Sequence, residues 1–168
     1  MKSRFQVSPT RRRKSRGHVM LESAFTLVPM FAMLLGIIDV SLMIFRWSTL
    51  QNAVREGVRY AITFQTQGAL GQTASIQNVV AQNAFGFVGV NDSPQHIFVD
   101  YLNSDFTTGS NTPGNVVRVT VKNVSFSWIA PLSGSIQRGV YTSTPITFQV
   151  AAADILGGYP AGATGVAP

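Results

Sequence analysis

The chain contains no cysteine. This absence excludes disulfide bonds, thiolate catalysis and cysteine-ligated metal sites, so an exported domain would have to be held together by its core alone. Charged residues are also scarce, at 12% of the 168 residues, whereas 45% are hydrophobic. The composition indicates one modest domain together with a segment more apolar than a soluble protein requires.

Sequence patterns typical of enzymes are also missing. The chain has no HExxH pattern, no phosphate-cradling glycine loop and no nucleophile elbow. Its two histidines, His18 and His96, are far apart, and carboxylates such as Asp100 and Asp105 lie by a turn without basic or metal-ligating neighbours. We therefore expect no catalytic residues, no metal site and no cofactor, and a protein that acts by binding or assembly.

One long stretch lacks charge altogether. It runs from Ser23 to Ile38, and Asp39 is the only ionisable group between it and Arg46. At ~1.5 Å per residue, residues 23–45 would form a helix of about 34 Å, enough to cross a hydrocarbon core of about 30 Å. Lipid offers no hydrogen-bonding partner to backbone amides, whereas a helix pairs them within the segment. A helix is therefore expected here despite a proline and a glycine within the stretch.

Positive charge is concentrated before this stretch. Residues 1–17 carry seven Lys/Arg and no acid, whereas residues 18–168 carry six Lys/Arg and seven Asp/Glu, a net of −1. Basic residues beside a spanning helix stay in the cytoplasm, so the N-terminus is expected inside and the chain from Arg46 onward outside. The apolar stretch argues against the other interpretation, a nucleic-acid-binding arm, and we expect no nucleic-acid partner.

A cleaved secretory signal peptide has a similar basic start and apolar middle. Two features argue against one here. The apolar run exceeds the usual length of about 7–15 residues. In addition, residues 43–47 are bulky, where a signal peptidase needs small side chains.

The helix is predicted to continue beyond the membrane, from about Val19 to Phe64. Apolar residues recur at spacings of three and four, which places them on one helix face. These residues are Leu50, Ala53, Val54, Gly57, Val58, Ala61 and Ile62. Trp47 lies where an indole favours the membrane–water boundary.

Further along, Ser75 is predicted to cap a second short helix. Alternating apolar residues indicate strands at 97–102, at 117–122 with an extension towards Trp128, and at 146–150. The segment Pro131–Gly139 is predicted to be a loop, and Phe126 and Trp128 are expected in the core. The amphipathic helix half can cover the three strands, so the predicted fold class is α+β, a long N-terminal helix packed on a small, mainly antiparallel sheet.

The edge of the basic leader has a distinctive arrangement. Gly17 ends the leader, and Glu22 follows five residues later. A carboxylate inside a bilayer costs several kcal/mol unless it is paired. Cleavage after Gly17 would create an α-amino group on His18, and the amine of one subunit can pair with the carboxylate of a neighbour. In the simpler alternative, Glu22 is an interfacial charge that snorkels to water.

These residues resemble a type IV prepilin cleavage site. The segment Gly36–Ala61 resembles the TadE-like minor pilin (pseudopilin) family of tight-adherence, or Flp, pili. In that family a Gly-Ile-(Ile/Val)-Asp segment ends the membrane helix. A segment like Asn-Ala-Ala-Arg-Glu-Gly-Ala-Arg-Tyr-Ala follows, here Asn52–Ala61 with Val54 and Val58 at two of the Ala positions. The resemblance is strong over about Gly17–Phe64.

The resemblance implies a single-pass, inner-membrane subunit needed for assembly of a tight-adherence pilus. It also implies processing by a prepilin peptidase. The implied partners are other pilins and the tight-adherence secretion machinery. His18, which would form the new N-terminus, bears on the efficiency of processing. The expected organisation is a cleaved leader, a transmembrane helix, an extracytoplasmic pilin-like α+β domain and a disordered tail, at 1–17, 18–46, 47–156 and 157–168. The alternative is an uncleaved, signal-anchored extracytoplasmic binding domain.

The role of two further groups of charged residues has two interpretations each. Asp39 either has a role within the membrane or in assembly, or snorkels towards the outer interface. Arg55, Glu56 and Arg59 either contact another subunit or form a solvated face. A Glu56–Arg59 pair on such a face would be worth a few tenths of a kcal/mol.

Overall fold

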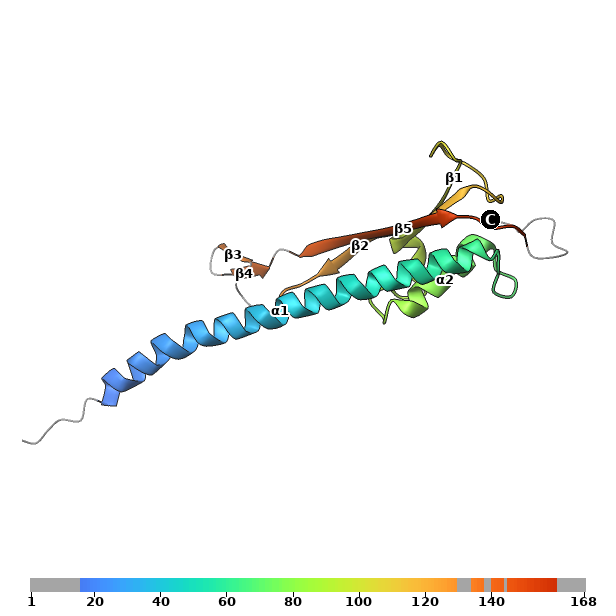
Figure 1. The fold of residues 1–168 in the computed structure, drawn as a ribbon. Coiled ribbons are helices and arrows are strands. Elements are labelled where there is room, and N and C mark those ends of the chain that lie inside the picture. The colour runs from blue at the N-terminus through green and yellow to red at the C-terminus, as the bar shows by residue number, and fades with distance from the viewer. Residues whose placement is uncertain (1–15, 130–133, 138–139, 144, 160–168) are drawn as a thin grey trace, which may run out of the picture.

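The computed structural model describes residues 16–129, 134–137, 140–143 and 145–159. In Figure 1 the N-terminal half of the first helix projects away from the domain, and its C-terminal half lies against the sheet. The predicted α+β fold is confirmed. The elements are α1 (Arg16–Ile62), α2 (Gln72–Asn83), α3 (Ser93–His96), β1 (Ile97–Leu102), β2 (Val116–Phe126), β3 (Gly134–Gln137), β4 (Val140–Ser143) and β5 (Ile146–Ile155).

The long helix α1 has two different halves. The helix, over His18–Ile62, is the one candidate membrane span in the described part of the chain, judged by length and composition, and its apolar 18-residue window has a mean hydropathy of 2.3. Only 6% of that apolar window is buried. The helix continues without a break through Pro29 and into the domain. It ends at Ile62, where Gln72 of α2 donates a 2.9 Å hydrogen bond to the Ala61 carbonyl, one of the groups that a helix end leaves unpaired.

The main sheet has the order β1-β2-β5 and is antiparallel throughout. Val121 lies in the middle of it, opposite Ile97 of β1 and Val150 of β5. The register shifts between Val121 and Val124, where Asn123 has a φ of 61°. The alternation predicted for β2 is present, because its odd-numbered valines 117, 119 and 121 are fully buried.

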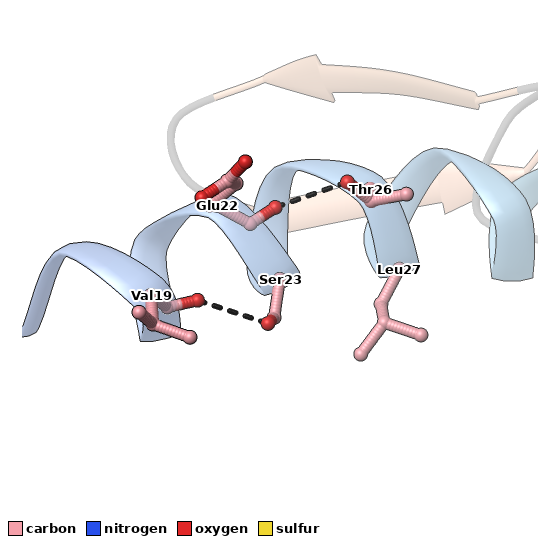
Figure 2. Close-up of a pocket in the computed structure, with 5 residues that line it drawn as sticks. All are labelled: Val19, Glu22, Ser23, Thr26 and Leu27. Atoms are coloured by element: carbon pink, nitrogen blue, oxygen red, sulfur yellow. Dashed lines mark hydrogen bonds between the residues drawn. The ribbon is translucent and has the colours of Figure 1, made fainter. Parts of the chain in front are cut away.

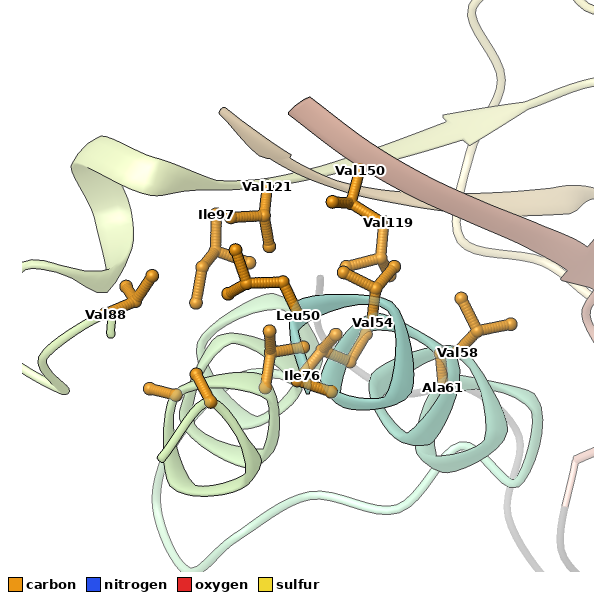
Figure 3. Close-up of a cluster of buried hydrophobic side chains, with 14 of the residues drawn as sticks. Leu50, Val54, Val58, Ala61, Ile76, Val88, Ile97, Val119, Val121 and Val150 are labelled. Carbon is orange, nitrogen blue, oxygen red and sulfur yellow. The ribbon is translucent and has the colours of Figure 1, made fainter. Parts of the chain in front are cut away.

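The core forms where the second half of α1 meets α2 and the sheet. Figure 3 shows a stripe of α1 side chains pointing towards valines of β2 and β5 on one side and towards Ile76 of α2 on the other. The stripe consists of Leu50, Val54, Val58 and Ala61. Full burial of a Leu or Val side chain contributes roughly 1.5–3 kcal/mol, so this stripe is the main attachment of α1 to the domain.

Three local predictions need correction. Ser75 does not cap α2, because the helix begins at Gln72; the buried Ser75 hydroxyl instead donates to Gly71 O at 2.8 Å and accepts from Gln67 N–H. The segment predicted as a loop at 131–139 contributes to a second, two-stranded sheet, β3–β4, which sequence alternation did not reveal.

The predicted disordered tail also begins in contact with the domain. The ring of Tyr159 packs on that of Phe64, with centroids 4.7 Å apart, and its hydroxyl donates to Asn111 O at 3.4 Å. The rest of the predicted tail, 160–168, lies outside the described residues.

A substitution at Gly57 tests the contact between the two main helices. A Cβ at this position would overlap the Val80 side chain of α2. Gly57→Ala should therefore lower the free energy of unfolding by about 1–3 kcal/mol, as overpacking does. Denaturant unfolding of the detergent-solubilised chain, followed by tryptophan fluorescence, measures the change.

The matched control is Gly158→Ala, whose new methyl group meets nothing within 4 Å. Adding Val80→Ala to Gly57→Ala should recover part of the lost stability, because it removes the overlapping group. Equal stability of Gly57→Ala and the Gly158→Ala control would show that the helices do not approach this closely.

Candidate functional site

The candidate processing residues lie on the first turns of α1. The helix begins at Arg16 and therefore includes Gly17. His18 and Glu22 are both exposed and, being four residues apart, lie on one face. Glu22 lies beside a shallow depression on the helix surface, and Figure 2 shows its side chain with those of the neighbouring turns. The residues that line it are Val19, Glu22, Ser23, Thr26 and Leu27.

The hydroxyl groups in this depression are satisfied within the helix. Ser23 Oγ donates to Val19 O at 2.9 Å, and Thr26 Oγ1 donates to Glu22 O at 3.0 Å. Such bonds let hydroxyl groups enter an apolar environment without outside partners. Among the described residues, the Glu22 carboxylate forms no ion pair. The Glu22 carboxylate is thus the polar side-chain group of this depression that the helix itself does not pair.

Asp39 has a different environment. It is fully buried, with 0% of its surface exposed, and its Oδ1 accepts a 2.9 Å hydrogen bond from the backbone N–H of Ile129. The carboxyl group is therefore turned towards the connection that follows β2. Neither sequence interpretation included this contact, because its partner lies 90 residues away and is a backbone amide.

Arg46 forms a second attachment, which sequence reasoning missed. Its guanidinium lies over two aromatic rings, 4.9 Å from the centroid of Phe87 and 5.1 Å from that of Phe126. It also donates to Ser125 O at 3.3 Å. Cation–π contacts of this kind are worth about 0.5–2 kcal/mol each. Arg46 thereby joins α1 both to the segment after α2 and to the end of β2.

The predicted core aromatics lie beside this attachment. Phe126 is 3% exposed and makes an edge-to-face contact with the partly buried Trp128, with ring centroids 5.6 Å apart. The expectation is confirmed for Phe126, which belongs to the core, and Trp128 packs against this core while partly buried.

The charged residues further along α1 face solvent. Arg59 and Glu56 form an ion pair of 3.3 Å with side chains 76% and 49% exposed, so screening leaves it little energy. Arg55 and Arg59 also line an open groove between α1 and residues 151–154 of β5. The predicted Glu56–Arg59 pair is present, and both arginines border a surface that another protein can reach.

No group of three or more histidine, aspartate and glutamate residues in the described part of the chain is arranged to hold a metal ion. The site residues are thus charged groups spaced along one helix, at 22, 39, 46 and 55–59. Their arrangement suits the positioning of a helix between two environments.

A known protein family matches the helix that carries these residues. Residues 17–59 match the family described as TadE-like protein, as the resemblance predicted. The match begins at Gly17 and ends three residues before α1 does, so the sheet lies outside it. No curated protein and no solved structure matches the chain.

The contact between Asp39 and Ile129 can be tested by mutation. Asp39→Ala leaves the Ile129 N–H without its acceptor, which should lower the free energy of unfolding by about 1–3 kcal/mol. Asp39→Asn keeps an oxygen acceptor and should cost less. The measurement is denaturant unfolding of the full chain in detergent.

Glu56→Ala is the control, because it removes an exposed carboxylate of the same helix and should change stability by less than about 0.5 kcal/mol. If Asp39→Ala unfolds like Glu56→Ala, the hydrogen bond does not hold the connection in place.

Proposed function

We propose that the chain is a single-pass minor pilin, or pseudopilin, that takes part in the assembly of a tight-adherence (Flp-type) pilus. The observation that carries this proposal is the exposed N-terminal half of α1. Large apolar side chains from Val19 to Ile38 lie outside the core. Such a surface is stable in lipid or against other apolar helices. The match of residues 17–59 to TadE-like proteins supports the same function.

In this proposal the helix anchors the chain in the inner membrane before assembly. The seven positive charges of residues 1–17 keep the leader in the cytoplasm, and the domain lies on the other side. A prepilin peptidase removes the leader between Gly17 and His18. The processed helix then packs against other pilins. These pilins are delivered by the tight-adherence secretion machinery.

Glu22 directs the assembly step in this proposal. After cleavage, the α-amino group of His18 lies within about one helical turn of Glu22 in the same chain and equally close to the membrane boundary. Either charge alone is costly to remove from water, whereas the two together form a charge-assisted hydrogen bond. A pair between the amine of one subunit and the carboxylate of the next would favour uptake into the filament and set its register.

The other charged residues support this role from the domain. We assign Arg55, Glu56 and Arg59 to a contact with a neighbouring subunit, since Arg55 and Arg59 border the open groove beside β5. Asp39 contributes indirectly, by holding the connection after β2 against the helix.

The first test concerns processing. The mature protein should begin at His18, and Gly17→Ala should block cleavage while the chain still enters the membrane, since the apolar run and the positive leader are unchanged. N-terminal mass spectrometry of the membrane-extracted protein measures both. Gly36→Ala, a glycine deeper in the same helix, is the control and should be cleaved normally.

Full-length protein with Met1 attached, recovered from a native host with active prepilin peptidase, would contradict the processing step. It would favour the alternative of an uncleaved anchored domain.

The second test separates assembly from processing. Glu22→Ala should be cleaved and inserted normally but should lose co-purification with other pilins. Removing one partner of a dry charge pair costs about 3–5 kcal/mol, so the co-purified amount should fall by at least about tenfold. The co-purified amount should fall similarly with Glu22→Gln, because this substitution keeps the size of the side chain but removes its charge.

Thr26→Ala provides the control for this test, because it changes the same helix face and leaves the carboxylate in place. Wild-type co-purification and piliation with Glu22→Ala would mean that Glu22 only snorkels at the end of the anchor.

A further inference from the structure

Within the described residues of α1, no spacer separates the exposed N-terminal half of the helix from the domain. α1 is one continuous helix from its exposed half into the core. Asp39, at 0% exposure, is the first buried residue of α1, and its carboxylate contacts the backbone of Ile129. The run before it, residues 18–38, is about 31 Å long at ~1.5 Å per residue, close to the ~30 Å of a hydrocarbon core. A bilayer that covers this run therefore reaches the domain itself.

Large apolar side chains are exposed at this end of the domain. Ile129, whose N–H contacts Asp39, is 63% exposed. Three residues of α1 that follow Asp39 are also between 47% and 56% exposed, namely Ile44, Phe45 and Trp47. We refer to these four residues, Ile44, Phe45, Trp47 and Ile129, as the membrane-proximal rim. They come from segments more than 80 residues apart, and the three on α1 lie within about 12 Å of Asp39 along the helix axis at ~1.5 Å per residue.

The rest of the chain at this level favours contact with lipid. Asp39, the acidic residue here, is turned into the protein, so no carboxylate from α1 opposes the rim. Figure 1 shows the β3–β4 hairpin standing off the main sheet on the side of the N-terminal half of α1. The described strands β3 and β4 thus lie on the same side of the domain as the N-terminal half of α1 (Figure 1).

We propose that the rim is a lipid-contacting surface, by which the domain is seated directly on the outer face of the bilayer. Its occupant is the interfacial layer between headgroups and acyl chains, where aromatic side chains, tryptophan above all, are favoured. The inference rests on the proposed membrane anchoring and adds a second contact, made by the domain as well as by the helix. Burial of Ile129 and Phe45 in this layer fixes the tilt and height of the domain on the membrane.

The test uses depth-dependent quenching of tryptophan fluorescence by brominated lipids. The chain contains two tryptophans, Trp47 and Trp128. The full chain with W47F and W128F receives one new tryptophan, I129W, and is reconstituted into phosphatidylethanolamine–phosphatidylglycerol vesicles that contain phosphatidylcholine brominated near the carbonyl end of its acyl chains. We expect at least about twofold quenching of I129W, and of Trp47 in the W128F chain, as for side chains in the interfacial layer.

Two matched controls make the result specific. F106W, in the same double-substituted background, replaces a residue that is 72% exposed at the β1–β2 turn and should not be quenched. F31W replaces a residue 56% exposed within the apolar run and reports on the anchor, with lipids brominated deep in the acyl chains. If the fluorescence of F31W is not quenched, the proposed insertion of the helix into the membrane is overturned. If F31W is quenched but I129W is no more quenched than F106W, the seating of the domain is overturned and the anchor stands.

A second measurement covers the possibility that the tryptophan replacements disturb folding. Because the chain has no cysteine, I129C and F106C in the otherwise unchanged protein each provide one thiol. A water-soluble maleimide should label I129C at least about fivefold more slowly than F106C in vesicles, because the interfacial layer shields this position. Equal labelling would overturn the proposal, and so would efficient cross-linking of I129C between two copies, which would identify a second subunit as the occupant.

Discussion

The packing of one stripe of α1 determines how the rest of the chain is arranged. Leu50, Val54, Val58 and Ala61 follow one helix face, and α2 and the main sheet both meet at it. Gly57, at the same face, permits α2 to approach closely. Because α1 is continuous, the position of this stripe also sets the direction and reach of the exposed N-terminal half. The apolar run can leave the domain in one direction only, along the axis that the core imposes.

Two polar contacts define where the helix passes from one environment to the other. Asp39 accepts a hydrogen bond from Ile129, and two turns later Arg46 lies between Phe87 and Phe126. Both contacts satisfy a charged or polar group of α1 within the protein. The transition spans the segment from Asp39, the first buried residue of α1, to Leu50, where the core begins, and exposed apolar residues such as Phe45 and Trp47 lie within it.

The long helix and the α+β fold could be predicted from the sequence because they depend on local periodicity. Apolar residues at spacings of three and four from Leu50, and alternating valines in β2, indicate buried faces without knowledge of the partners. The interpretation of Gly17 and Glu22 as a processing site rests on their spacing from the apolar run, and it stays a prediction.

The contacts of Asp39 and Arg46, which sequence reasoning missed, join distant segments. The partner of Asp39 is a backbone amide 90 residues away, and the guanidinium of Arg46 meets rings from two separate segments. No local pattern encodes such pairs. The β3–β4 hairpin escaped prediction because four-residue strands are too short to show alternation. Ser75 was assigned to a cap because serine favours that position, but here its hydroxyl has partners inside the fold.

The lengthwise alignment of α1 with the sheet has a mechanical consequence. In Figure 1, β2 and β5 run along the C-terminal half of α1 rather than across it. A pull on the N-terminal half along the helix axis, as when a subunit is drawn from a bilayer, therefore loads the interface in shear. All contacts along the stripe resist together, whereas strands lying across the helix would yield one after another. In the proposed anchoring, α1 can thus transmit a tensile force to the domain without first separating from the sheet.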